Sequence, residues 1–312
     1  MTQVQESSAA RAARPAPSRN GWPGVAALAL GTFTVVTSEM LPVGLLTPMG
    51  RSLGVPEGVA GLTLTITGLV AALSAPALVP LLGRADRRTA LCVLVAAALL
   101  LPRLPAERTV PLGGVLRLTR DPRLRTGLLV VGLLVTGHFA AYTYVRPVLE
   151  DVTGVGAGTI GALLLVYGIA GVAGNFLAGA GAARSPRTTL LVIGTVLAPT
   201  VAALPWLGGS PALAAVLMAV WGLGYGGVSV ATQTWVLLAA PDAREAASSL
   251  FVGVFNGAIA LGALAGGLVA DRVGVTAVMG TGAALVAGAL VTTAAGRAPA
   301  PAPEPAPAPA RT

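Results

Sequence analysis

Few side chains in this sequence could do chemistry, and most of them lie inside long apolar runs. Glu39 is the one carboxylate inside a full-length run, a little past the middle of the first run at 24–49. A charge at the centre of a bilayer costs roughly 3 kcal/mol on insertion scales, so intramembrane charges face a cavity or a partner. We therefore expect Glu39 to carry a proton, and the alternative is a structural hydrogen bond to a neighbouring helix.

A second polar group begins at His138, the only histidine. His138, Tyr142 and Arg146 recur every four residues, which places them on one stripe of a helix, and Pro147 follows directly. Such a stripe would line the path of a solute, or it would hold neighbouring helices together as packed polar side chains. The sequence supports both interpretations equally.

Amides and aromatic residues in the later runs offer further contacts. Three runs carry one amide each: Asn175, Gln233 and Asn256. Hydrogen bonds between helices are the commoner role of such amides, and contact with a solute is the alternative. Trp221 and Tyr225 share a run with Trp235 and would line an aromatic wall, although Trp235 equally suits an anchor at the membrane surface.

Catalytic and metal-binding sites need residue types that this chain nearly lacks. One histidine and one cysteine, Cys92, exclude most catalytic triads and metal sites. The glycines at 222, 224 and 226 lie inside an apolar run, without the context of a phosphate-binding loop. We therefore expect no enzymatic activity, no metal and no cofactor.

The elements that must position these residues are membrane-spanning helices. Hydrophobic residues make up 54% of the 312 residues and charged residues only 10%, whereas soluble domains carry about a quarter charged residues. A helix of about 20 apolar residues crosses the hydrocarbon core of a bilayer. Eight runs are long enough: 24–49, 58–82, 126–147, 157–182, 188–207, 211–239, 246–270 and 274–296. The sequence thus predicts an all-α polytopic membrane protein with about eight full spans.

Arginines between the runs predict the orientation. The net charge of +8 comes from twenty arginines without any lysine, and because they lie between apolar runs we expect a lipid bilayer, and no nucleic acid, as partner. Cytoplasmic loops collect positive residues, and alternate connections hold the arginines: 11–19, 84–88, 103–125, 184–187, 244 and 297. Both termini are therefore expected to be cytoplasmic, in an inner (plasma) membrane. The 13-residue apolar segment 89–101 is expected to be a half-span, because a crossing there would place the basic loop outside.

The chain also repeats itself at an offset of one hundred residues. The matched pairs include Gly61 with Gly161, Gly68 with Gly168, Arg84 with Arg184, and Arg87 with Arg187. Parallel repeats of this kind are a signature of transporters built from two halves.

Four segments carry a family resemblance: SEMLPVGLLTPMGRSLGV (38–55), LLGRADRRTAL (81–91), GNFLAGAGAARSPR (174–187) and PDAREAASSLFVGVFNGAIALGALAGGLVADRVG (241–274). With them the chain resembles a major facilitator superfamily transporter of the drug/proton antiporter or sugar-efflux type. The resemblance implies two six-helix bundles that alternate in access, and proton-driven efflux of a small drug-like or sugar-like solute. It also implies a cytoplasmic gate, formed by these residues: Asp86, Arg87, Arg88, Arg184 and Arg187.

The first half departs from that family. Helices three to six of a complete first half have no counterpart here, so roughly 95 residues, about four spans with their connections, are missing. The sequence predicts five regions: a disordered cytoplasmic tail (1–23), a truncated N-terminal bundle (24–101), a basic cytoplasmic loop (102–125), an intact six-helix bundle (126–296) and a Pro/Ala-rich cytoplasmic tail (297–312). The alternative function is that of a truncated remnant that transports nothing. Self-association would replace the missing helices.

Overall fold

The computed structural model describes residues 50–56, 59–70, 117–154 and 156–299, and every regular element in them is a helix. The elements follow in the order α7 (Pro122–Tyr142), α8 (Val145–Thr153), α9 (Ala157–Arg184), α10 (Pro186–Leu207), α11 (Pro211–Gly226), α12 (Val228–Ala239), the 3₁₀ turn η1 (Pro241–Ala243), α13 (Arg244–Arg272) and α14 (Ala277–Ala295). A shorter apolar helix covers Val59–Val70. The expected span 24–49 and the segment 89–101 lie outside the described residues.

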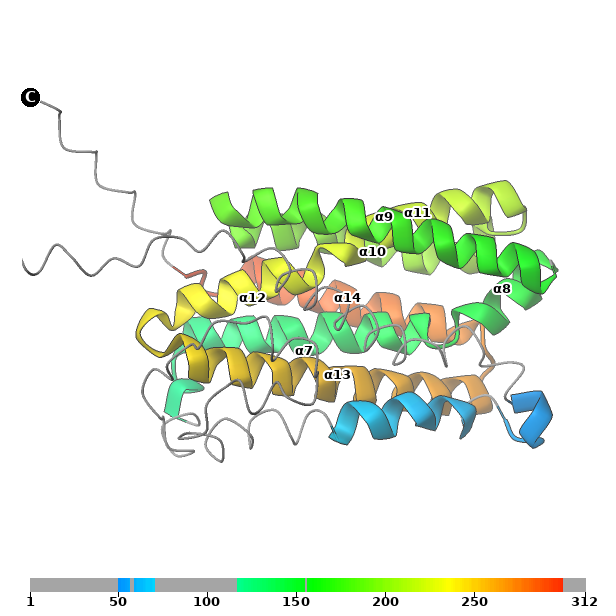
Figure 1. The fold of residues 1–312 in the computed structure, drawn as a ribbon, viewed down its shortest axis with the longest axis horizontal. Coiled ribbons are helices and arrows are strands. Elements are labelled where there is room, and N and C mark those ends of the chain that lie inside the picture. Colours follow the sequence, from blue (N-terminus) through cyan, green and yellow to red (C-terminus); the bar gives the residue numbers. More distant parts are fainter. Residues whose placement is uncertain (1–49, 57–58, 71–116, 155, 300–312) are drawn as a thin grey trace, which may run out of the picture. The chain divides into compact units, whose positions relative to one another are not determined.

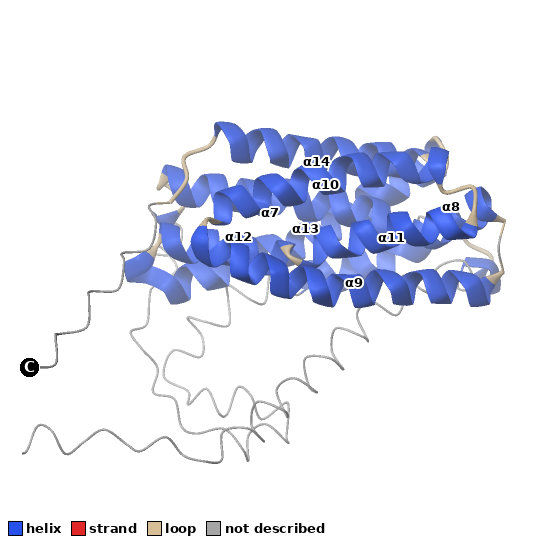
Figure 2. Ribbon diagram, turned by 90° about the horizontal axis from the view of Figure 1, so that it is seen from above, coloured by secondary structure: helices blue, strands red, loops and turns tan. Residues whose placement is uncertain are grey.

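Six stretches of the described chain are long and apolar enough to cross a membrane (Figure 1). They coincide with six of the eight expected runs: Pro122–Tyr142, Gly158–Arg184, Pro186–Leu207, Pro211–Ala239, Pro241–Arg272 and Ala277–Ala295. Helices α7 to α14 lie side by side in both ribbon views (Figures 1 and 2). The expected all-α polytopic membrane fold is therefore confirmed.

Three helices start at the same sequence signal, a capping side chain followed by proline. Asp121 Oδ1 accepts hydrogen bonds from the backbone N–H groups of Arg123 (2.7 Å) and Leu124 (3.2 Å) at the start of α7. Ser185 and Ser210 cap α10 and α11 in the same way. The proline that follows each cap loses no helical hydrogen bond at that position and already has a helical φ. These signals fix where the three spans begin.

The helix expected over 126–147 ends earlier, at Tyr142. A turn at 143–144 follows, and the chain continues as the short helix α8. Pro147 explains the break, because a proline inside a continuous helix would lack its N–H and clash with the carbonyl of residue 143. His138 and Arg146 therefore lie on different helices, and the predicted single stripe is wrong.

Helices α9 and α11 approach closely through glycines. A Cβ atom added to Gly222 of α11 would strike the backbone of Tyr167 in α9, and one added to Gly226 would strike the backbone of Gly171. Small residues let membrane helices gain van der Waals contact at short range, where apolar burial offers no driving force. The glycines of α11 are therefore packing residues.

The run expected over 211–239 forms two helices, α11 and α12, that meet at Gly227. In α12 the side chain of Trp235 is fully buried, and its Nε1–H donates a 3.0 Å hydrogen bond to the carbonyl of Arg123. This indole fixes α12 against the start of α7. Its contact supports a structural role for Trp235.

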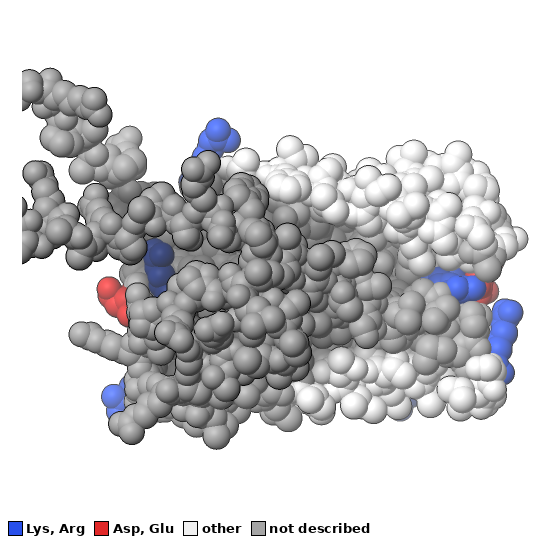
Figure 3. All heavy atoms as spheres, in the orientation of Figure 1, with Lys and Arg blue, Asp and Glu red and all other residues white. Residues whose placement is uncertain are grey.

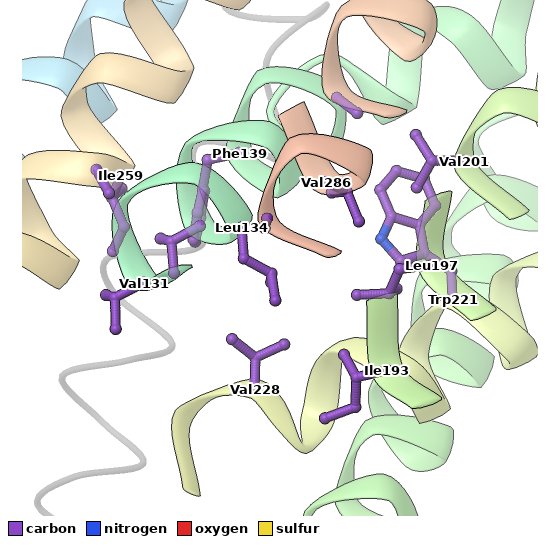
Figure 4. Close-up of a cluster of buried hydrophobic side chains, with 14 of the residues drawn as sticks. Val131, Leu134, Phe139, Ile193, Leu197, Val201, Trp221, Val228, Ile259 and Val286 are labelled. Atoms are coloured by element: carbon purple, nitrogen blue, oxygen red, sulfur yellow. The ribbon is translucent and has the colours of Figure 1, made fainter. Parts of the chain in front are cut away.

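Apolar side chains fill the space between the helices (Figure 4). The labelled members come from six helices: Val131, Leu134 and Phe139 of α7, Ile193, Leu197 and Val201 of α10, Trp221 of α11, Val228 of α12, Ile259 of α13 and Val286 of α14. Polar side chains are rare in this interior. A buried polar group costs free energy unless it has a hydrogen-bond partner.

Charged side chains gather near the helix ends. Among residues 117–299, one end of the bundle holds eight arginines: Arg117, Arg120, Arg123, Arg125, Arg184, Arg187, Arg244 and Arg297. The opposite end holds two arginines among three carboxylates: Arg146, Arg272, Glu150, Asp151 and Asp271. Figure 3 shows charges towards both ends and uncharged described surface between them. This distribution suits helices whose middles lie in hydrocarbon.

Candidate functional site

An aromatic cluster surrounds the only histidine, in the interior of the bundle. The ring of His138 on α7 stacks on Tyr225 of α11, with centroids 3.3 Å apart, and on Tyr142 one turn further along α7, at 5.0 Å. Trp221 of α11 meets the imidazole edge-on at 5.7 Å, and Tyr167 of α9 lies at 6.3 Å. Three helices thus bring five rings together, and we call them the aromatic cluster.

Hydrogen bonds indicate which nitrogen of the imidazole carries the proton. The indole Nε1–H of Trp221 lies 3.1 Å from His138 Nδ1, and an indole can only donate. Nδ1 must therefore accept, which leaves the proton of a neutral imidazole on Nε2. Tyr167 Oη lies 3.4 Å from Nε2 and accepts that proton in a longer hydrogen bond. Both ring nitrogens are thus used inside the cluster.

One hydroxyl of the cluster has no partner. Tyr225 Oη is buried and makes no hydrogen bond among the residues that the structure describes. A buried polar group without a partner costs free energy, and in a native protein it often marks a site completed by a water or a ligand.

The three tyrosines of the cluster also have a partly open side. His138 and Trp221 are almost fully buried, whereas Tyr142, Tyr167 and Tyr225 are half-buried. A planar solute could therefore meet stacked tyrosine faces there, with the imidazole and the indole behind them, and it would reach the buried Tyr225 hydroxyl only after the packing around that hydroxyl opens. Aromatic faces attract other rings in offset-stacked or edge-on arrangements.

Helical spacing explains how the chain builds this cluster. His138 and Tyr142 are four residues apart, and so are Trp221 and Tyr225, so each pair occupies one stripe of its helix. The sequence identified both pairs but not their meeting. Tyr167 was missed, because no spacing in the sequence gives its position opposite Gly222, whose missing side chain lets the α9 backbone approach.

The remaining predicted residues are not part of the aromatic cluster. Arg146 forms an ion pair with Glu150 at 3.0 Å within α8, and both side chains are partly exposed. Asn256 Nδ2 donates to the Val252 carbonyl of its own helix at 2.9 Å. Gln233 is half-buried on α12. The structure gives none of these three a place beside His138.

The expected gate lies mostly outside the described residues. Glu39 and the loop residues Asp86, Arg87 and Arg88 cannot be placed, because the structure describes none of them. Two gate residues are described: Arg184 is exposed at the end of α9, and Arg187 donates to the carbonyl of Ala294 at the end of α14. Arg187 therefore joins α10 to α14 at the arginine-rich end.

Six apolar spans packed through glycines, with a polar and aromatic group held in the interior, define a polytopic membrane protein of the transporter type. The sequence model of the Major Facilitator Superfamily matches residues 89–263 and 128–312. The chain belongs to this superfamily and is a multi-pass membrane transporter.

Curated relatives align along most of the chain. It is 29% identical to a protein named transcription regulatory protein OpdE from Pseudomonas aeruginosa, over 91% of this chain and 96% of that protein. It is 26% identical to proteins named purine ribonucleoside efflux pump NepI. The NepI of Salmonella paratyphi B aligns with 82% of this chain and 89% of its own length, and that of Escherichia coli O127:H6 with 89% and 95%.

One alignment is longer than the chain itself. The alignment with OpdE extends over 388 positions, whereas this chain has 312 residues. At least 388 − 312 = 76 positions of that alignment therefore contain no residue of this chain.

Proposed function

We propose that this chain exports a small planar solute with a polar, sugar-like part across the inner membrane, in exchange for protons. The observation that carries the proposal is the aromatic cluster, in which three helices bring five rings together around His138. A nucleoside combines a flat base with a sugar and so matches both the drug-like and the sugar-like expectation. The relatives named NepI support the same solute class.

Recognition would use the partly open side of the aromatic cluster. The base stacks on the half-buried tyrosine faces, since flat rings gain both area and quadrupole attraction there. The Tyr225 hydroxyl, which has no partner among the described residues, forms a hydrogen bond with a polar substituent of the solute, and this bond offsets the cost of burying it. Trp221 and Tyr167 hold the imidazole in one orientation behind this surface.

Movement and coupling would follow the scheme of two-halved transporters. The glycine contacts between α9 and α11 keep the second bundle together while the access to the aromatic cluster changes sides. Glu39, as the carboxylate of the first run, would carry the coupled proton. The arginine-rich end would face the cytoplasm, where Arg184 and Arg187 would form the gate together with Asp86, Arg87 and Arg88.

Tyr225→Phe tests the recognition step, with Tyr144→Phe as its matched control. Tyr144 Oη donates a 3.0 Å hydrogen bond to the Ala263 carbonyl and lies outside the aromatic cluster. In proteoliposomes supplied with a purine nucleoside, Tyr225→Phe should raise the half-saturating concentration about fivefold, the value of one net hydrogen bond. It should not lower stability, because the hydroxyl that it removes is buried without a partner among the described residues. Tyr144→Phe should do the reverse. An unchanged half-saturating concentration in Tyr225→Phe refutes the proposed contact.

Glu39→Gln tests the coupling separately. We expect this variant to bind the solute but to lose the dependence of transport on a pH gradient, because the amide cannot exchange a proton at this position. If transport by Glu39→Gln still depends on the pH gradient, the proposed proton coupling through Glu39 is wrong. The proposed solute site would not be affected by that result.

A second candidate function rests on the alignment length. At least 76 aligned positions lack a residue in this chain, which supports the interpretation that the first bundle is truncated. A truncated chain would bind membrane helices without moving a solute. No transport by this chain, beside active transport by a full-length relative in the same vesicles, favours this second function.

A further inference from the structure

A groove of about 480 Å³ lies between α9 and α10 and is also lined by the end of α11. It begins where α9 ends at Arg184, and the single residue Ser185 joins its two walls. Its lining residues Leu177 and Val192 are 66% and 59% exposed, so the groove opens onto the outside of the described bundle. Asn175, the remaining amide predicted from the sequence, is exposed on α9 and does not line it. We call this feature the α9–α10 groove, and its volume lies in the range of pockets that hold a small organic molecule.

The lining of the α9–α10 groove changes character with depth in the membrane. Leu177 lies seven residues before the end of α9 and Val196 ten residues after the start of α10, so the apolar part extends roughly 10 to 15 Å from the connection. That distance reaches the middle of a hydrocarbon core about 30 Å thick. The other part, at the arginine-rich end, is lined by Arg184, Ser185 and Thr188. A phospholipid is divided in the same way, with its phosphate at the membrane surface and its chains below.

The polar part of the α9–α10 groove holds unused hydrogen-bond donors. Arg184 is exposed and forms no ion pair or hydrogen bond with the residues that the structure describes. Ser185 Oγ and Thr188 Oγ1 lie 2.9 Å apart, so one hydroxyl donates to the other, and the accepting hydroxyl keeps its own proton to donate. A guanidinium binds a phosphate through two parallel N–H groups. These donors together suit a phosphate anion.

Charge distinguishes an anionic lipid from other molecules that could cover the groove. In the described chain this end holds eight arginines against the carboxylates of Asp121, Asp242 and Glu245, a net charge of 8 − 3 = +5. Two long segments outside the described residues are positive themselves: residues 1–49 hold three arginines and two carboxylates, and residues 71–116 hold five and two. A second copy in the same orientation would add eight more arginines at the same depth. Anionic lipids neutralise such an end, and basic pockets between membrane helices bind their headgroups.

We propose that the α9–α10 groove binds one anionic phospholipid. The phosphate lies against Arg184 and the hydroxyls of Ser185 and Thr188, and one acyl chain follows Leu177 and Val196 towards the middle of the membrane. Lipid tails are as apolar as the groove, so burying the chain there offers no hydrophobic gain over the surrounding bilayer. The preference for this lipid therefore comes from the charge of its headgroup, and the groove determines where the chain lies.

Native mass spectrometry of the full chain tests the phosphate contact. Offered equal amounts of phosphatidylglycerol and of phosphatidylcholine with the same acyl chains, the protein should retain one phosphatidylglycerol. Arg184→Gln should weaken this binding about tenfold, the effect of one hydrogen bond to a charged group. Arg120→Gln is the control, because it removes the same charge from an exposed position at the same end, outside the groove. Lipid retention is measured rather than transport, since Arg184 also belongs to the proposed gate. Equal weakening by both variants, or equal retention of the two lipids, overturns the proposal.

Val192→Trp tests the path of the acyl chain, and Val172→Trp on α9 is its matched control. The two valines are 59% and 61% exposed, but only Val192 lines the groove. Both variants should therefore fold, which size-exclusion chromatography checks. The larger side chain in Val192→Trp should fill the groove and abolish the retention of phosphatidylglycerol, whereas Val172→Trp should leave it unchanged. Retention that persists in Val192→Trp, or that both variants abolish, contradicts the proposed site.

Discussion

Trp221→Phe separates the packing of a buried indole from its hydrogen bond to His138. Phenylalanine keeps an edge-on ring but removes the Nε1–H that lies 3.1 Å from His138 Nδ1. Trp235→Phe is the matched control. Trp235 is equally buried and also donates one hydrogen bond, of 3.0 Å, but to the Arg123 carbonyl outside the aromatic cluster.

The two variants should lose comparable stability. A buried acceptor left without its donor costs about 1–3 kcal/mol in water-soluble proteins, and hydrogen bonds inside membrane proteins average about 0.6 kcal/mol. The smaller ring leaves a partial cavity that adds to this cost. We therefore expect each substitution to lower the free energy of unfolding by about 1–2 kcal/mol.

Transport activity should distinguish Trp221→Phe from Trp235→Phe. Only Trp221→Phe releases His138 Nδ1, so the imidazole can exchange tautomers and turn away from Tyr225. A loss of 1–2 kcal/mol in the contact with solute corresponds to about a 5- to 30-fold rise in the half-saturating concentration. Unfolding in detergent and nucleoside transport in proteoliposomes are measured on the same preparations. The reasoning is refuted if Trp235→Phe impairs transport as strongly as Trp221→Phe at equal stability.

Three further predictions concern packing, charge and orientation. Gly222→Leu drives a side chain into the α9 backbone and should lower the free energy of unfolding by about 3 kcal/mol. A Cβ added to Gly161 meets no atom within 4 Å, so Gly161→Leu should leave the yield of folded protein unchanged in size-exclusion chromatography. Glu150→Gln breaks a partly exposed ion pair within one helix and should change the free energy of unfolding by less than about 1 kcal/mol. In a cysteine-free background, a membrane-impermeant maleimide added to intact cells should label Gly209→Cys and not Arg120→Cys; the opposite pattern would invert the proposed orientation.

The sequence predicted the spans well because hydrocarbon imposes a length and a composition on every helix that crosses it. The caps at Asp121, Ser185 and Ser210 could be placed in the same way, since they are local signals. Position 147 shows the limit. The expected run extends to it, and only the structure shows that α7 ends at Tyr142 and that α8 begins at Val145, which places Arg146 and His138 on different helices.

The candidate site was predicted in two separate pieces. Spacing within a helix reveals the pair His138 and Tyr142, and likewise Trp221 and Tyr225, because one turn separates the members. Spacing does not give the rotation or depth of one helix relative to another. The contact of α7 with α11, and the arrival of Tyr167 from α9, depend on glycine packing between helices that are distant in sequence.

The buried position of Trp221 has a practical consequence for spectroscopy. Of the three tryptophans in the described residues, Trp206 is 85% exposed, and Trp235 is held by a backbone carbonyl away from the aromatic cluster. Trp221 alone shares a hydrogen bond with the only imidazole of the chain. A molecule that enters beside His138 therefore changes the surroundings of one of these three indoles and spares the other two. With the fourth tryptophan removed by Trp22→Phe, the emission of the unlabelled protein should report occupancy directly.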